Sequence, residues 1–317
     1  MGAYWKKRYD IPYVIDMQDP WHNDYYQDKP KKQRPPKYWF SYRLNKHMER
    51  IAMKKVDGLV AVSESYICAL KGRYPYIKHI PAAAITFGFF EKDFEIALQN
   101  KDKFQALLEE GFINIVYVGR GGMDMHKAIS PVFEAFAAGL ASDVKLFSNI
   151  RFYFIGTSYA APGEGNQTIR PLAEKYGVQE HVVEITNRIS YFHSLLTLQQ
   201  ADVLFIPGSD DPQYTASKLY PYLALQKPLL AIFNEKSNAV PVLQNCVENA
   251  VVFTFNQDGI SLVTAINQRL RLWAGGVFSI VQLLPGFERY SARNLTGKQT
   301  ALFDATLTYF EAKNRSV

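Results

Sequence analysis

Residues 201–233 constrain the fold of this chain more than any other stretch. Two short apolar runs, residues 203–206 and 229–233, flank a segment with helical character. Buried apolar runs of this length on either side of a helix are typical of parallel α/β units. In open parallel sheets, ligands bind beyond the carboxyl ends of the strands, where residues 207–218 would lie. The stretch therefore predicts a parallel sheet with a ligand site at one edge.

Pro221 indicates where the intervening helix begins. A proline is tolerated in the first helical turn, because its missing N–H has no intrahelical partner there. We therefore expect the helix to start near residues 217–220. The free N–H groups of that start, beside Ser217 and Lys218, form a candidate phosphate-binding position.

The loop VGRGGMDMHK, residues 118–127, follows another apolar run. Its glycines let the backbone approach a ligand closely, and its arginine and lysine supply donors for phosphate oxygens. The loop matches neither G-x-G-x-x-G nor the Walker motif, and alone it would more often be a structural turn. Together with the Ser-Lys helix start on the same sheet edge, it predicts a diphosphate site. The residues are Gly119, Arg120, Gly121, Gly122 and Lys127.

Length and composition place the chain among soluble globular proteins. Its 317 residues suit two domains, and 48% hydrophobic with 21% charged residues leaves a sizeable core. No apolar run reaches the ~20 residues of a membrane span, and the start of the chain lacks the apolar region of a signal peptide. Two cysteines, Cys68 and Cys246, favour a reducing compartment. We therefore expect a cytoplasmic protein.

Positive charge is concentrated between Lys29 and Lys55. Ten lysines or arginines lie there against one acid, Glu49, with aromatic residues interleaved. Two interpretations are about equally favoured: an ordinary solvated helix, or a helix that binds an anionic membrane surface at the inner face of the membrane. Nucleic-acid binding would leave the second half of the chain unexplained, so we do not expect it.

The order of apolar runs predicts two Rossmann-like α/β domains, of which the first is incomplete. Short strands are expected at 11–16 and 58–62, but too few precede residue 88 to complete a sheet. A second series of strands begins at residue 113. We expect a partial first domain at 1–95, a second domain at 96–296, and a final helix within 297–317 that packs back toward the first domain.

Several of these segments resemble one family. VGRGGMDMHK and ADVLFIPGSDDPQYTASKLYPYLALQKPLLA are similar to the second domain of GT-B nucleotide-sugar glycosyltransferases of the group 1, family 4 type. IPYVIDMQDPW resembles a strand and loop from the second half of that family's first domain. The resemblance covers nearly the whole chain. It implies a hexosyltransferase-type enzyme of polysaccharide biosynthesis that needs no metal or cofactor and moves sugar, with retention, from a nucleoside diphosphate to a saccharide or lipid-linked acceptor.

The resemblance also implies roles for particular residues. Arg120 and Lys127 would contact the donor diphosphate, and Ser217 and the backbone that follows it, at Lys218, would hold its distal phosphate. Arg188 and Ile189 would frame the nucleobase, and Asp210 and Asp211 would lie on the loop that faces the sugar. Asp19 lies in a loop that should face the same cleft and would contact the sugar, although Asp-Pro-Trp is also a common turn.

The chain departs from the family pattern at the ribose. Pro221 stands where the family has an acidic ribose ligand, and Gln213 where it has the partner acid, so Asp210, Asp211 or Tyr214 would have to substitute. Two functions therefore stay open. The chain is a glycosyltransferase, or it is a catalytically impaired GT-B relic that binds nucleotide or acts as a scaffold. In either case we expect the chain with its incomplete first domain to be a poor enzyme.

Overall fold

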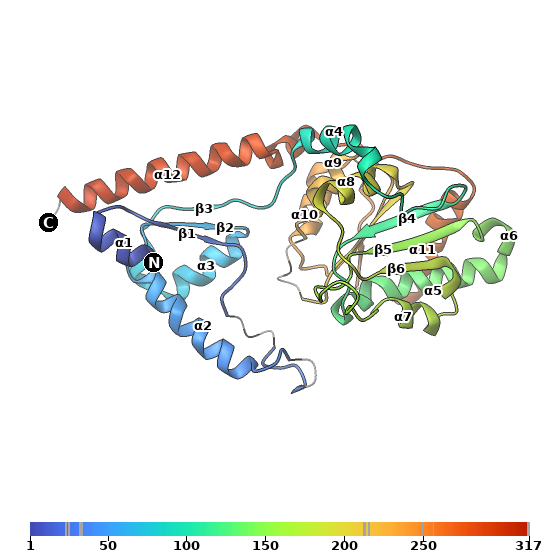
Figure 1. The fold of residues 1–317 in the computed structure, drawn as a ribbon, viewed down its shortest axis with the longest axis horizontal. Coiled ribbons are helices and arrows are strands. Elements are labelled where there is room, and N and C mark those ends of the chain that lie inside the picture. The colour runs from blue at the N-terminus through green and yellow to red at the C-terminus, as the bar shows by residue number, and fades with distance from the viewer. Residues whose placement is uncertain are drawn as a thin grey trace. The chain divides into compact units, whose positions relative to one another are not determined.

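The computed structural model describes residues 1–22, 24, 26–31, 34–211, 214, 216–248, 250–255 and 257–315. Lys32 of the basic stretch and Gln213 lie outside these residues. The chain divides into two compact units (Figure 1). Unit 1 comprises residues 1–88 and 289–317, and unit 2 comprises residues 89–288. These boundaries fall several residues before the ends at 95 and 296 that the sequence suggested.

Unit 1 contains a three-stranded parallel sheet of order β1-β2-β3. Its strands are β1 (Val14–Met17), β2 (Gly58–Ala61) and β3 (Ala82–Ala84). Its helices are α1 (Gly2–Tyr9), α2 (Tyr38–Met53), α3 (Glu64–Arg73) and α12 (Ala292–Arg315). Helix α12 contacts β2 and β3. The sequence did not reveal α1, which is short, largely polar and without buried residues.

Local chemistry explains how unit 1 forms. The Ser63 hydroxyl accepts a hydrogen bond from the Ser65 N–H and caps α3, as its position before the helix predicts. Strand β2 is buried along its whole length. Gly58 at its start lies against Thr306 of α12, and a β-carbon there would overlap the threonine hydroxyl. The absent side chain therefore lets α12 approach the sheet.

A buried charged cluster ties two helices of unit 1 to the loop that follows β1. The Glu49 carboxylate in α2 pairs with the Arg73 guanidinium at the end of α3 and accepts a hydrogen bond of 2.9 Å from the Tyr74 hydroxyl. The Nε2 atom of His22 lies 3.3 Å from the same carboxylate. Because Glu49 is only 1% exposed, these partners take the place of water around its charge.

Unit 2 is a doubly wound α/β domain. Its six parallel strands have the order β6-β5-β4-β7-β8-β9, so the winding direction reverses between β4 and β7. The strands are β4 (Ile113–Val118), β5 (Ile150–Ile155), β6 (Val182–Ile185), β7 (Val203–Pro207), β8 (Leu229–Phe233) and β9 (Phe253–Thr254). Strand β9 has two residues. A reversal of this kind opens a crevice at the carboxyl ends of the central strands.

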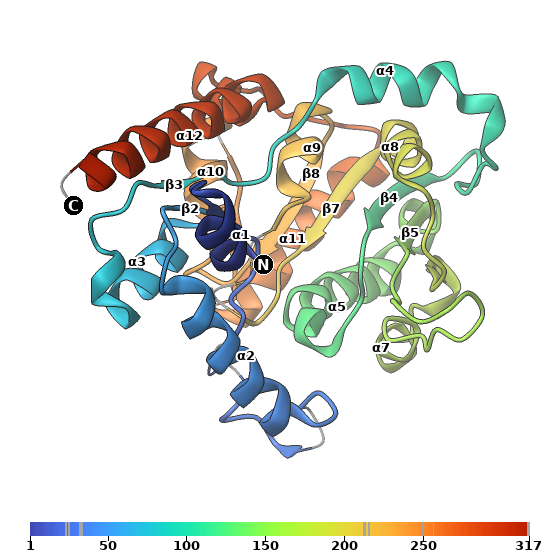
Figure 2. The ribbon, with the colours of Figure 1, turned by 60° about the vertical axis from the view of Figure 1, so that its left-hand side comes forward.

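Helices cover both faces of the unit 2 sheet (Figures 1 and 2). They are α4 (Glu91–Gln99), α5 (His126–Ser142), α6 (Val144–Phe147), α7 (Arg170–Lys175), α8 (Tyr191–Gln200), α9 (Leu219–Ala224), α10 (Ala239–Cys246) and α11 (Gly259–Ala274). The largest core lies between the sheet and α5, α6, α7 and α11. Helix α5 begins at His126 because the turn at residues 123–125 leads directly into it, which places Pro131 inside the helix. Among the described residues, no helix is long and apolar enough to cross a membrane.

Candidate functional site

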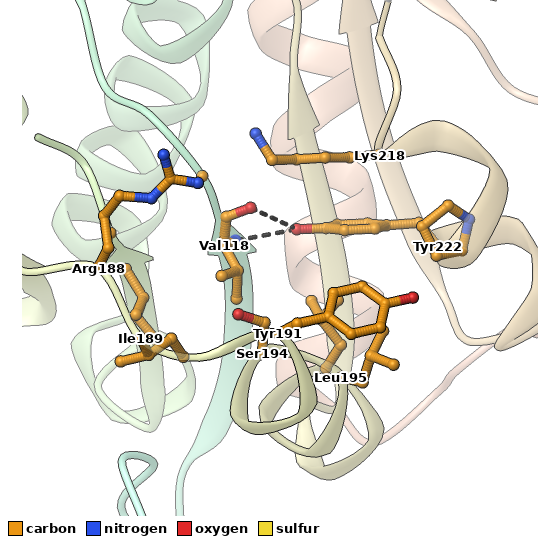
Figure 3. A pocket seen from close by; sticks show the side chains of 13 residues that line it. Val118, Arg188, Ile189, Tyr191, Ser194, Leu195, Lys218 and Tyr222 are labelled. Atoms are coloured by element: carbon orange, nitrogen blue, oxygen red, sulfur yellow. Dashed lines mark hydrogen bonds between the residues drawn. The ribbon is translucent and has the colours of Figure 1, made fainter. Parts of the chain in front are cut away.

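A cavity of about 260 Å³ lies in unit 2 at the carboxyl ends of the central strands (Figure 3). Val118 and Gly119 from the end of β4 and Ile155 and Gly156 from the end of β5 contribute to its wall. The segment after β6 and helices α8 and α9 complete it. It therefore occupies the switch-point edge that the strand order defines.

Two cations form one end of the cavity. In Figure 3 the Lys218 and Arg188 side chains extend toward each other across Val118 at the end of β4. The Arg188 guanidinium lies 4.8 Å from the ring centroid of Tyr159. Like charges placed in this way repel each other, so an anion between them would be stabilised.

Lys218 is held in place without a carboxylate partner among the described residues. Its Nζ donates a hydrogen bond of 3.4 Å to the Tyr117 hydroxyl, which in turn donates to the Arg120 carbonyl at 3.0 Å. The ammonium group lies directly over Gly119, where a β-carbon would overlap it. Burial, followed by the charges of Arg120 and Arg188, lowers the pKa of Lys218 to about 8.

The other end of the cavity is mainly apolar. Figure 3 shows Ile189, Leu195 and Tyr191 on that side, away from the ammonium group of Lys218. The Tyr222 hydroxyl accepts a hydrogen bond of 2.9 Å from the Val118 N–H, and burial raises the pKa of this tyrosine. The hydroxyl therefore binds the last residue of β4 as a neutral group. The cavity thus offers cationic donors at one end and a hydrophobic wall at the other.

Arg120 lies beside the cavity and is held by an acid that the sequence analysis did not single out. Its two terminal nitrogens donate to the Asp124 carboxylate at 2.9 and 2.6 Å. Ser209, buried in the loop after β7, donates to the same carboxylate at 2.7 Å. Burial opposes ionisation of Asp124, but the hydrogen bonds from Arg120 and Ser209 outweigh it and lower the pKa of Asp124. The guanidinium is therefore oriented, with part of its donor capacity still available.

The structure brings together some of the residues predicted for the donor site. Gly119, Arg188, Ile189 and Lys218 line the cavity, and Arg120 adjoins it. The loops after β4 and β7 converge because these strands are parallel neighbours. Ser217 immediately precedes Lys218, the residue that caps α9, but it does not line the cavity.

Other predicted residues take part in the surrounding loops. The Asp210 N–H donates to the Asp124 carbonyl at 2.8 Å, and the Asp211 N–H donates to the Ser209 hydroxyl at 3.1 Å. The Tyr214 ring lies 5.5 Å from the Arg120 guanidinium. These contacts show how the loop after β7 is joined to the loop after β4.

The remaining predicted residues lie outside the cavity wall. Gly121 packs against Thr157 and Thr168, and Gly122 packs against Asp124 and Arg120. Lys127 is exposed near the start of α5. Asp19 belongs to unit 1, where it follows β1 with an exposed side chain. Their roles toward a donor stay predictions.

Sequence reasoning missed the residues that position the site. Asp124 lies four residues after Arg120, a spacing that would have indicated an ion pair. Tyr117 and Tyr222 read as ordinary core residues of a strand and a helix, and only their hydroxyl contacts distinguish them. Nothing in the sequence of α8 marks Leu195 as part of a cavity wall.

Two histidines of unit 2 tether loops through backbone carbonyl groups. The Nε2 atom of His126 lies 3.0 Å from the Thr168 carbonyl, and that of His193 lies 2.8 Å from the Gln105 carbonyl. Within the described part of the chain, no group of three or more histidine, cysteine, aspartate or glutamate side chains is placed to hold a metal ion.

Comparison with solved structures identifies the fold. No family model and no curated protein sequence matches the chain. WaaG, a glycosyltransferase involved in lipopolysaccharide biosynthesis, is similar over 87% of this chain and 74% of its own, with a TM-score of 0.54 and 15% identity. Sucrose-phosphate synthase from Thermosynechococcus elongatus gives a TM-score of 0.54 at 13% identity, over 97% of this chain and 71% of its own.

A third similar structure is the N-terminal domain of Candida albicans trehalose-6-phosphate phosphatase. Its TM-score is 0.60 at 16% identity, and the match covers 96% of this chain and 67% of that one. The chain therefore has the GT-B fold, as the resemblance of its sequence segments implies.

Proposed function

We propose that the chain transfers a sugar from a nucleoside-diphosphate donor to a saccharide or lipid-linked acceptor. The observation that carries this proposal is the two-ended cavity at the switch point of unit 2. Its cationic end, with Lys218 and Arg188, suits a diphosphate, and its apolar end, with Ile189 and Leu195, suits a nucleobase. The GT-B fold supports the same class of reaction.

The proposed mechanism relies on position and charge. Lys218 and the oriented guanidinium of Arg120 would stabilise the negative charge that develops on the departing diphosphate, which eases cleavage of the bond between it and the sugar. Asp124 would hold Arg120 in place, and Tyr117 would hold Lys218. We propose retention of configuration, with Asp19 toward the sugar and no metal or cofactor, as the sequence resemblance implies.

A second function is favoured by one specific observation. Pro221 lines the cavity where the resemblance places an acidic ribose ligand, and none of the described residues that line the cavity is a carboxylate. A protein that binds nucleotide without turning over a sugar would tolerate this loss. The alternative is therefore a GT-B relic that serves as a nucleotide-binding or scaffold protein.

Binding and turnover separate the two functions. Titration calorimetry with UDP, GDP and ADP should show binding of at least one, and a panel of the corresponding nucleotide sugars should then be assayed for diphosphate release. Binding with release supports the transferase. Binding without release, in the presence of saccharide acceptors, supports the relic. If none of these nucleotides binds, the transferase and the nucleotide-binding relic are both wrong, and only the scaffold role is left.

Arg120→Ala is expected to weaken binding of a nucleoside diphosphate by about 1.5–3 kcal/mol, the usual contribution of a charge-assisted hydrogen bond. Binding of the nucleoside alone should change little, because the base and ribose do not require the guanidinium. Calorimetry with both ligands measures the difference. Equal losses for the two ligands would mean that Arg120 only supports the loop through Asp124.

We also propose a peripheral association with an anionic membrane surface through the region from Lys29 to Lys55. Its support is the surplus of lysine and arginine there, in a chain of net charge +6. A membrane-bound position would suit a lipid-linked acceptor. Acceptor chemistry and membrane association can be tested independently of the donor site.

A further inference from the structure

The outward side of α2 carries a row of exposed apolar side chains that the charge pattern of the sequence does not reveal. We call this row the α2 ridge. Its residues follow one another at spacings of four, four and three, which places them on one side of the helix. Each is between 44 and 52% exposed. The ridge consists of Phe40, Leu44, Met48 and Ile51.

The opposite side of α2 faces the protein. Met53 and Glu49 are buried there, and Glu49 belongs to the cluster with Arg73 and His22. The Tyr13 hydroxyl donates to the Ala52 carbonyl on this side. These contacts fix the rotation of the helix, so the ridge is held facing away from the core of unit 1.

Cations follow the ridge along one flank. A rotation of 100° per residue places Arg43, Arg50 and Lys54 side by side there, and all three are exposed. Glu49 is the only acid in α2, and it is buried on the other side. Trp39, which is exposed, lies on the cationic flank. The exposed surface of the helix is thus apolar along its centre and positive beside it.

Helix α2 is also longer than the sheet that supports it. Its 16 residues span about 24 Å, whereas the strands of unit 1 have three or four residues and span about 10–13 Å. Figures 1 and 2 both show the N-terminal part of α2 extending beyond β1 and β2. A flat partner could therefore reach this part of the helix without contacting the strands.

We propose that α2 lies in the plane of an anionic bilayer, with the α2 ridge inserted at the boundary between headgroups and acyl chains. Arg43, Arg50 and Lys54 would then lie at the level of the headgroup phosphates. Such an arrangement is the usual one for an interfacial amphipathic helix. The inference rests on the peripheral association proposed above, and it assigns the contact to apolar insertion as well as to charge.

The chemistry of the surface favours a bilayer over other partners. Two copies of the same face would bring cationic flanks together and repel each other. A nucleic acid would satisfy the cations, but it offers no apolar phase for Leu44, Met48 and Ile51. An anionic bilayer satisfies both parts of the surface at once.

The ridge can be tested with a closely matched control. Phe40→Ser combined with Leu44→Ser removes two ridge residues four positions apart. Phe303→Ser combined with Leu307→Ser removes the same pair of residue types, at the same spacing, from α12 of the same unit, where they are 42 and 48% exposed. Both double variants are compared with the wild type in sedimentation with vesicles of phosphatidylcholine containing phosphatidylserine.

The ridge variant is expected to lose at least about tenfold in its partition coefficient, because it removes apolar area that would otherwise enter the membrane. The α12 variant should bind like the wild type. Charge reversal at Arg43 and Arg50 should cost at least about fivefold per residue, and high salt should mask this loss, whereas Lys298→Glu with Lys313→Glu should have little effect. Quenching of Trp39 fluorescence by brominated lipids should report a shallow position.

Several outcomes would overturn the assignment. If the ridge variant binds vesicles like the wild type while charge reversal abolishes binding, the association is purely electrostatic. The proposed membrane association then stands, but the insertion of the α2 ridge is wrong. If the wild type ignores anionic vesicles, both membrane proposals are wrong, while the donor site is unaffected. A wild-type dimer that the ridge variant cannot form assigns the surface to a second copy. Salt-sensitive binding to an oligonucleotide, stronger than to vesicles, assigns it to nucleic acid.

Discussion

Lys218→Met is expected to reduce the affinity for a nucleoside diphosphate about 10- to 150-fold, which corresponds to about 1.5–3 kcal/mol. Methionine preserves the apolar stem but removes the ammonium group at the cationic end of the cavity. Lys218 lacks a carboxylate partner among the described residues, so its charge is available to a bound phosphate. Titration calorimetry with the nucleotide that binds the wild type best measures the loss.

Lys227→Met provides the matched control. Lys227 is also partly buried, and burial also lowers its pKa, but it precedes β8 and donates to the Ala201 carbonyl at 2.6 Å, at the opposite edge of the sheet. Its replacement should leave nucleotide affinity unchanged. If both variants lose affinity equally, the loss reflects unfolding of the unit, and the assignment of Lys218 to the anion site is wrong.

The pH dependence of nucleotide affinity follows from the ammonium group of Lys218. In the free protein the pKa of Lys218 is lowered to about 8 from 10.5, whereas a bound diphosphate would raise it again. Nucleotide affinity should therefore decrease as pH rises above about 8, and Lys218→Met should not show this decrease. The stability of the fold should change with pH in the opposite direction. Between about pH 8 and pH 10.5, Lys218 has lost its proton in the folded chain but keeps it in the unfolded chain, so the free energy of unfolding increases as the pH rises.

Glu49→Ala is expected to lower the unfolding free energy by about 3–5 kcal/mol, the usual result of removing one partner from a buried ion pair. The substitution leaves Arg73 without its counter-charge and the Tyr74 hydroxyl without its acceptor. It also leaves a cavity beside His22. Because α2, α3 and the loop after β1 all meet at this carboxylate, unit 1 should lose cooperative unfolding as well as stability.

The control is Glu311→Ala, which removes an exposed acid from α12 and should cost little. Chemical denaturation, with hydrogen exchange to assign the loss to unit 1, measures both variants. In a double-mutant cycle, Glu49→Ala with Arg73→Ala should cost clearly less than the sum of the single changes. Strict additivity would mean that the carboxylate and the guanidinium do not stabilise each other.

The sequence by itself determined the class of fold and the edge of the sheet where the site lies. Apolar runs near residues 115, 204 and 231 predicted a parallel sheet, because strands buried on both faces must be apolar throughout. The loops after β4 and β7 could be paired in advance, because carboxyl ends of parallel strands share one edge. These are rules of chain direction and periodicity, which a sequence carries directly.

The tertiary structure decided which of the predicted side chains line the cavity and what holds them there. Lys218 reaches the cavity because Gly119 leaves space for it and the Tyr117 hydroxyl holds it, two conditions set by segments about 100 residues away. Arg120, which the sequence also predicts for the site, pairs with Asp124 beside the cavity. Such choices depend on distances between segments remote in the chain, and local patterns do not encode them.

The same distinction holds for the basic stretch. The sequence showed a surplus of cations between Lys29 and Lys55, but charge alone fits a solvated helix as well as a membrane-bound one. The contacts of Glu49 with Arg73 and His22 fix the rotation of α2, and that rotation exposes the α2 ridge. A helical sequence specifies which residues share a face, whereas the face that turns outward is decided by what the other face is buried against.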